Sequence, residues 1–123
     1  MLKKTINMNL TYSIDNSEQG ILIFNLSGKI LSKEDSELIS NEIDENIEKG
    51  NIHVIFHLKE LDYINSTGLN FIISSFTKMR NEGGELVISS VSQKVEDLLV
   101  ITKLNTIFTA FKTLSEAKDS FSK

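Results

Sequence analysis

The chain has 123 residues, of which 40% are hydrophobic and 24% charged, so the sequence predicts one globular domain over residues 1–123. The net charge of −4 argues against nucleic acid or an anionic membrane as a partner, and the lack of cysteine excludes disulfide bonds, thiolate catalysis and cysteine zinc sites. No signal-peptide pattern is present and no apolar run approaches the ~20 residues of a membrane span, so we expect a cytoplasmic protein without membrane insertion.

The first third of the sequence predicts a hairpin followed by a helix. Strands are expected near residues 10–14 and 21–26, and the short turn over residues 16–20 favours antiparallel pairing. Ser32 begins a helix, with Asp35 placed three residues later as in a capping box. Gly50 should follow the end of this helix. The predicted inward-facing stripe consists of Leu38, Ile39, Ile43 and Ile47.

The centre of the sequence predicts a buried strand that turns directly into a helix. The apolar run 54–58 forms the strand, and the helix follows with apolar residues at i, i+3, i+4 and i+7 spacing. We expect Asn65 to be the N-cap, which leaves the hydroxyl of Ser66 at the first helical position and facing solvent. A helix N-terminus has free N–H donors and a partial positive charge, and it therefore suits an anion or a phosphoryl group. The inward-facing residues of this helix are Leu69, Ile72, Ile73, Phe76 and Met79.

The last third predicts one strand and two further helices. Gly83 and Gly84 end the central helix before a strand at 85–88, Ser92 caps a helix, and Thr113 with Glu116 forms a capping box for a terminal helix. The predicted core-facing residues here are Val95, Leu98, Leu99, Phe108, Phe111, Leu114, Ala117 and Phe121. The alternation of strands and helices predicts an α/β fold: a mixed, mostly parallel sheet with an N-terminal hairpin, flanked by about four helices.

Three runs of residues carry a resemblance to a known family. They are Leu26-Ser27-Gly28 followed by Leu38, then Tyr63-Ile64-Asn65-Ser66-Thr67-Gly68-Leu69, and Gly83-Gly84-Glu85-Leu86. Over residues 21–121 the chain resembles a STAS domain of the anti-sigma factor antagonist type. The resemblance implies the STAS fold and a non-enzymatic module without a cofactor, which binds an anti-sigma factor that is also a serine kinase. The serine that the kinase phosphorylates in that family corresponds to Ser66.

The resemblance also implies a binding surface and shows departures from the family pattern. The partner-binding residues are expected to be Asn65, Ser66, Thr67 and Asn70. Antagonists that are kinase substrates usually carry Asp before the serine, where this chain has Asn65. Leu31 and His57 stand where the family tends to have acidic or amide residues. All three changes remove negative charge or polarity near Ser66, so the sequence leaves its phosphorylation open.

Two alternatives remain at this point. One is a STAS subunit of a lipid-transport or stress-signalling complex. The other is a small nucleotide-binding protein or hydrolase that uses Ser66 with His57 as its base, although the Gly-x-Ser-x-Gly pattern of a nucleophile elbow is absent. No metal site is expected, because His53 and His57 lie roughly 13 Å apart along a strand at ~3.3 Å per residue. The partner's identity and the oligomeric state are not determined by the sequence.

Overall fold

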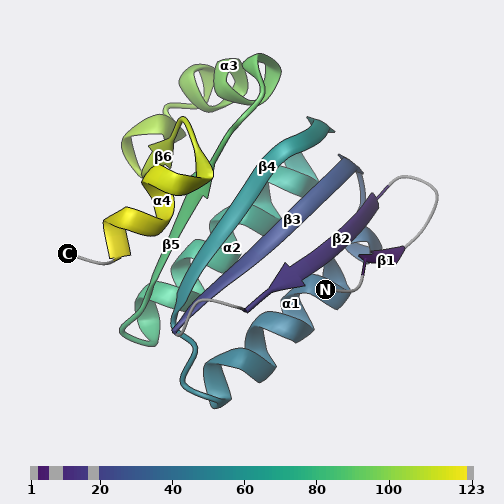
Figure 1. Cartoon of the computed structure of the whole chain (residues 1–123). Coiled ribbons are helices and arrows are strands. Elements are labelled where there is room, and N and C mark those ends of the chain that lie inside the picture. The colour runs from purple at the N-terminus through teal and green to yellow at the C-terminus, as the bar shows by residue number, and fades with distance from the viewer. Residues whose placement is uncertain (1–2, 6–9, 17–19, 122–123) are drawn as a thin grey trace.

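The computed structural model describes residues 3–5, 10–16 and 20–121. Its centre is a six-stranded sheet in which each strand lies beside the strand that precedes it in the chain (Figure 1). The second strand is antiparallel to the first and to the third, and the third to sixth strands are parallel. The strands are β1 Lys3–Thr5, β2 Leu10–Asp15, β3 Ile21–Ile30, β4 His53–Ile64, β5 Glu85–Ser89 and β6 Ala110–Phe111.

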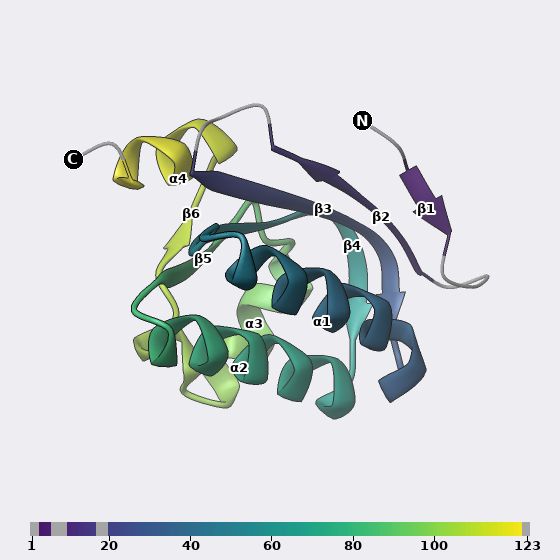
Figure 2. The same cartoon turned by 90° about the horizontal axis from the view of Figure 1, so that it is seen from below.

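Helices cover both faces of the sheet. The helices α1, α2 and α3 connect the parallel strands and lie on one face, whereas α4 lies on the other (Figure 2). A short 3₁₀ helix, Leu104–Thr106, follows α3. The α-helices are α1 Lys33–Glu48, α2 Ser66–Asn81, α3 Gln93–Ile101 and α4 Leu114–Phe121. The arrangement confirms the predicted fold class, a mixed and mostly parallel sheet with an N-terminal hairpin and four flanking helices.

The strands are apolar on both faces, and this produces two hydrophobic layers. Successive strand residues point to opposite faces, so Phe24 and Phe56 pack under α1–α3, while their neighbours Ile23 and Ile55 pack under α4. The rings of Phe24 and Phe56 pack edge to face, with their centroids 5.7 Å apart. The larger layer, between the sheet and α1–α3, supports the starts of the helices that form the candidate site.

Strands β3 and β4 are longer than the sequence predicted. They continue together to Ile30 and Ile64, beyond the point where β4 stops pairing with β5 at His57 and Ser89. Register shifts within the β3–β4 ladder interrupt the simple alternation, and Gly28 adopts a φ of 100° there. Because the alternation is broken, the sequence pattern predicted both strands to be shorter than they are. The extension carries the chain directly to the start of α2.

The local signals at the helix ends are confirmed, and one core assignment is wrong. Ser32 and Asp35 form the predicted capping box, and the side chains of Ser92 and Thr113 accept hydrogen bonds at the starts of their helices. Leu38, however, is 50% exposed. The buried line of α1 runs through Asp35, Ile39 and Ile43 at i, i+4 spacing, and a residue next to Ile39 lies about 100° around the helix from it.

Some elements were not predicted, and one prediction cannot be compared. The short edge strands β1 and β6 gave no pattern of their own. The predicted turn over residues 16–20 lies partly outside the described residues. Ile72, Phe76 and Met79 face the core as predicted, and Phe108 is buried with them.

Candidate functional site

Asn65 fixes the start of α2 through both ends of its amide. The side-chain oxygen accepts a hydrogen bond from the backbone N–H of Gly68 at 3.1 Å, which is the predicted N-cap. The amide nitrogen donates to the backbone carbonyl of Leu31 at 2.9 Å. The cap therefore also attaches α2 to the segment that leaves β3.

Leu31 links the starts of α1 and α2. Its N–H donates to the carboxylate of Asp35 at 2.8 Å, while its carbonyl accepts from Asn65. Asp35 is almost completely buried, and it also accepts from the backbone N–H of Ser32 at 3.0 Å. One peptide segment thus holds both helix N-termini side by side, and the role of Leu31 depends on its backbone rather than on its side chain.

Gly68 explains why the motif contains a glycine. A Cβ atom at this position would lie 2.8 Å from the carbonyl oxygen of Ile30 and 3.0 Å from the Cβ of Ile64. Both distances are shorter than an ordinary contact, so any side chain would push α2 away from the ends of β3 and β4. The close approach brings the first turn of α2 directly onto the sheet.

Ser66 is the first residue of α2 and is exposed. The side chain of Asn65 caps the helix, so in the described structure the side chain of Ser66 is not needed as a cap. The hydroxyl lies beside backbone N–H groups that have no intrahelical acceptor and beside the positive end of a 16-residue helix. This placement agrees with the prediction that the hydroxyl faces solvent at the first helical position.

The four predicted binding residues lie on two different grooves. Thr67 and Asn70 line a groove between α1 and α2 with a volume of about 330 Å³. Thr67, Asn70 and Ser74 are spaced i, i+3 and i+7, which puts them on one side of α2. We call this the α1–α2 groove, and its polar lining includes Lys33, Ser36, Ser40, Thr67, Asn70 and Ser74.

Asn65 and Ser66 line the second groove, between α2 and α3, which has a volume of about 440 Å³. Its walls are more apolar, with Leu69 on one side and Leu98 on the other, and Tyr63 at the end of β4 is 46% exposed beside them. We call this the α2–α3 groove, and its lining includes Tyr63, Ser66, Leu69, Lys94, Leu98 and Thr102. No pattern in the sequence connects α3 with the site, because the groove joins segments about 30 residues apart.

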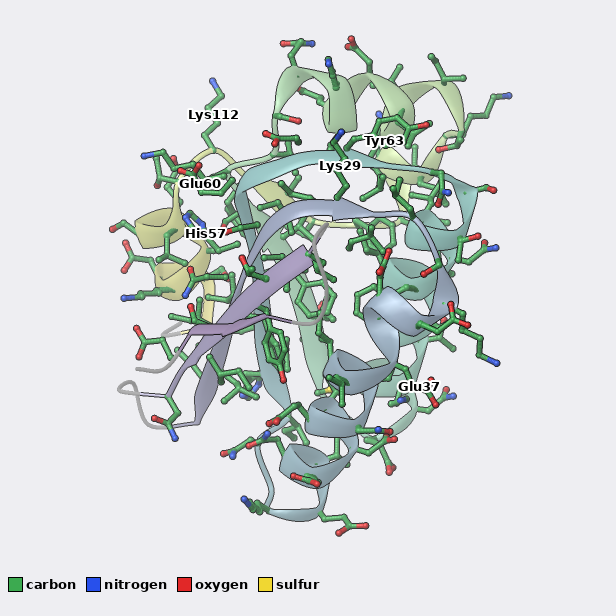
Figure 3. All side chains as sticks on the ribbon, turned by 90° about the vertical axis from the view of Figure 1, so that its right-hand side faces the viewer. Lys29, Glu37, His57, Glu60, Tyr63 and Lys112 are labelled. Atoms are coloured by element: carbon green, nitrogen blue, oxygen red, sulfur yellow. The ribbon has the colours of Figure 1, made fainter. Side chains whose placement is uncertain are left out.

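His57 lies in a separate hollow. Figure 3 shows His57 and Lys112 on the α4 side of the sheet, whereas Tyr63 lies toward α3. The hollow that contains His57 also contains Lys59 and Lys112, and Ser66 lines the α2–α3 groove instead. This separation gives no support to His57 as a base for Ser66.

The imidazole of His57 is engaged with the neighbouring strand. Its Nδ1 lies 2.9 Å from the hydroxyl of the fully buried Ser89. Burial lowers the pKa of His57 below its ordinary value, and the positive charge of Lys59 lowers it further against an opposing effect of Glu60. The other histidine of β4 is His53, and the centroid of its ring lies 4.9 Å from that of the Phe121 ring. Both histidines therefore have contacts within the fold.

Residues 3–5, 10–16 and 20–121 are the part of the chain that the structure describes. In this part of the chain, no group of three His, Asp or Glu side chains is arranged to hold a metal ion. None of the helices that the structure describes has the length and apolar character needed to cross a bilayer.

Comparisons with known proteins identify the family. The model of the STAS domain matches residues 13–117. The anti-sigma F factor antagonist of Paenibacillus polymyxa is 31% identical over 98 residues, which are 79% of this chain and 82% of that protein.

Solved structures show the same fold. An anti-sigma factor antagonist from Mycobacterium paratuberculosis matches with a TM-score of 0.79 at 16% identity, over 99% of this chain and 100% of that one. The Bacillus cell fate determinant SpoIIAA in its phosphorylated form matches with a TM-score of 0.72 at 16% identity, over 89% of this chain and 98% of that one. With a family model that spans most of its length and a relative above 30% identity, the chain belongs to the STAS domain family, together with the anti-sigma factor antagonists.

Proposed function

We propose that this protein is a cytoplasmic, non-enzymatic anti-sigma factor antagonist. It binds an anti-sigma factor through the surface around the start of α2, and phosphorylation of Ser66 by that partner causes the two proteins to dissociate. The family and the Paenibacillus relative support the kind of partner. The contact residues are Asn65, Ser66, Thr67 and Asn70, as the sequence suggested.

The observation that carries the proposal is the division of labour between Asn65 and Ser66. Asn65 makes both hydrogen bonds that fix the helix start, so the exposed hydroxyl of Ser66 is not required for the fold. A phosphoryl group adds about −1.5 to −2 charges and would stand at a helix N-terminus, where negative charge is favourable. The modification can therefore change binding without unfolding α2.

The same geometry accounts for the departure from aspartate before the serine. An aspartate at position 65 would keep the acceptor for the N–H of Gly68 but would lose the donor to the carbonyl of Leu31. In this chain the amide is therefore used to connect α2 with the end of β3. Asparagine at this position is consistent with a phosphorylated Ser66, because the hydrogen bond from its amide to the carbonyl of Leu31 accounts for its presence.

The test is the binding of Ser66→Asp to an anti-sigma factor kinase purified from the source organism. We expect Ser66→Asp to keep its thermal midpoint and to lose most of its affinity by calorimetry, because the added charge is desolvated against the partner without a counter-charge. Ser66→Ala is the matched control: it removes only the exposed hydroxyl and adds no charge, so it should keep most of the affinity. Unchanged affinity of Ser66→Asp, or unfolding of this variant, would make Ser66 a structural residue only.

Two further measurements separate binding from chemistry. Incubation with the kinase and ATP should add one phosphoryl group, which mass spectrometry should locate at Ser66 and which should be lost in Ser66→Ala. Turnover of esters, ATP or GTP by the purified protein should not exceed that of Ser66→Ala. A clear Ser66-dependent rate would instead support the hydrolase or nucleotide-binding alternative.

Thr67 and Asn70 test whether the partner also covers the α1–α2 groove. Replacement of Asn70 by tryptophan should weaken binding, since Asn70 is exposed at that groove. Thr77→Trp is the control, because Thr77 is exposed on the same helix two turns away and lines neither groove. Equal affinities for the two variants would restrict the binding surface to the side of Ser66.

A further inference from the structure

We propose that a phosphoryl group on Ser66 is held by Lys94 of α3, so that phosphorylation fills the α2–α3 groove and leaves the α1–α2 groove open. This inference rests on the proposed function, since it assigns the place and the counter-charge of the same modification. It identifies Lys94 as a positioning residue for the phosphoryl group and α3 as a part of the switch.

The direction follows from the position of Ser66 on α2. Ser66 and Leu69 are one turn apart and both line the α2–α3 groove. Thr67 lies about 100° further around the helix and lines the α1–α2 groove instead. A group attached to the hydroxyl of Ser66 is therefore directed toward α3.

Lys94 is the cation on the opposite wall of that groove. It is the second residue of α3, it is exposed, and within the described residues no carboxylate lies within ion-pair distance of it. The acidic residue of the groove, Asp97, accepts a hydrogen bond from the side chain of Gln93 at 2.8 Å. Among the described residues, the groove thus contains an ammonium group without an ion-pair partner and a carboxylate that accepts a hydrogen bond from a neighbouring amide on α3.

The position of Lys94 within α3 strengthens the argument. A lysine in the first turn of a helix lies near the positive end of the macrodipole, where a cation is unfavourable. A phosphoryl dianion beside it would interact favourably with its ammonium group and with the N-termini of both α2 and α3. The helices have 16 and 9 residues, so both have developed N-terminal ends.

Phosphorylation of Ser66 would change the access of a partner to the α2–α3 groove. The apolar floor of the α2–α3 groove consists of the partly exposed Leu98 and the small accessible part of Leu69, and a partner's side chain can reach it when Ser66 is unmodified. A phosphoryl group bound to Lys94 would bridge the groove above this floor and exclude that side chain. Charge repulsion and steric closure would then act at the same place.

The experiment uses the full chain with phosphoserine incorporated at position 66 during translation, so it needs neither the kinase nor the partner. The second ionisation of the phosphoryl group, which ordinarily has a pKa of about 6, is followed by phosphorus NMR as a function of pH. A nearby cation stabilises the dianion and lowers this pKa, and Lys94→Gln should therefore raise it by about 0.2–0.7 units. Lys33→Gln is the matched control, because Lys33 is an exposed lysine that lines the other groove.

A rise in Lys94→Gln that is absent from Lys33→Gln supports the proposal. Equal pKa values in both variants, or a larger rise in Lys33→Gln, would overturn it. Hydrogen exchange gives a second readout: phosphorylation should slow exchange in the first turn of α3, and Lys94→Gln should remove this protection. Circular dichroism verifies that both variants are folded. If Lys94 fails this test while Ser66→Asp still loses the partner, only the role of Lys94 is refuted.

Discussion

Replacement of Asn65 by alanine should cost more stability than the loss of a helix cap alone. The substitution removes the acceptor for the N–H of Gly68, and loss of an N-cap costs about 0.5–2 kcal/mol. It also removes the donor to the carbonyl of Leu31, a hydrogen bond with a net contribution of about 0.5–1.5 kcal/mol. We therefore expect the free energy of unfolding to fall by about 1–3.5 kcal/mol.

Asn65→Asp separates the two hydrogen bonds. The carboxylate keeps the cap and gains about 0.3–1 kcal/mol from the positive end of α2. It loses the hydrogen bond to Leu31, whose carbonyl would then face an anion. The two effects have opposite signs, so the unfolding free energy should fall by about 0–1 kcal/mol, less than in Asn65→Ala.

Urea unfolding followed by circular dichroism measures these differences. A loss of 2 kcal/mol should lower the midpoint by about 0.7–2 M at the slopes of about 1–3 kcal/mol/M that small proteins show. Ser66→Ala is the control, because the exposed side chain of Ser66 caps no helix in the described structure. Its free energy of unfolding should change by no more than about 0.5 kcal/mol. Equal midpoints for Asn65→Ala and Ser66→Ala would refute the stabilising role assigned to Asn65.

Three further predictions concern the surrounding fold. Phe76→Ala should cost about 3–5 kcal/mol in a denaturation experiment, because the ring is buried and lies 5.2 Å from that of Phe108. Gly84→Ala should cost about 1–3 kcal/mol, since its Cβ would collide with the carbonyl of Ile52; a midpoint like that of the unmodified protein would show that this turn can relax. The pKa of His57 is lowered in the folded state, so stability should fall as the pH falls from about 6.5 through the folded-state pKa. His57→Gln should remove this part of the pH dependence when urea midpoints at pH 7.5 and pH 5 are compared.

The sequence predicted best what depends on residues close together in the chain. The caps at Ser32 and Asn65 each involve a side chain and a backbone N–H three residues later, so residue type and spacing are sufficient to find them. Leu38 shows the opposite case. Its hydrophobicity fitted the helical pattern, but which side of α1 meets the sheet is decided by the strands, and Leu38 is left exposed.

The candidate site divides in the same way. The N-cap and the exposed first residue of α2 were predictable, because both follow from the local sequence. The hydrogen bond between Asn65 and Leu31 spans 34 residues, and Lys94 approaches the groove from a third helix. Such contacts depend on the parallel sheet that aligns the helix starts. No pattern within a single segment contains this information.

The order of strands in the sheet bears on how the protein forms during synthesis. Each new strand is added at the edge made by the strand before it, and none is inserted between two earlier ones. A chain leaving the ribosome can therefore extend the sheet one strand at a time, with each connecting helix covering the ladder just completed. These 123 residues also contain no proline, so prolyl isomerisation cannot delay any step. The groove beside Ser66 would be completed only after α3 has followed β5, late in translation.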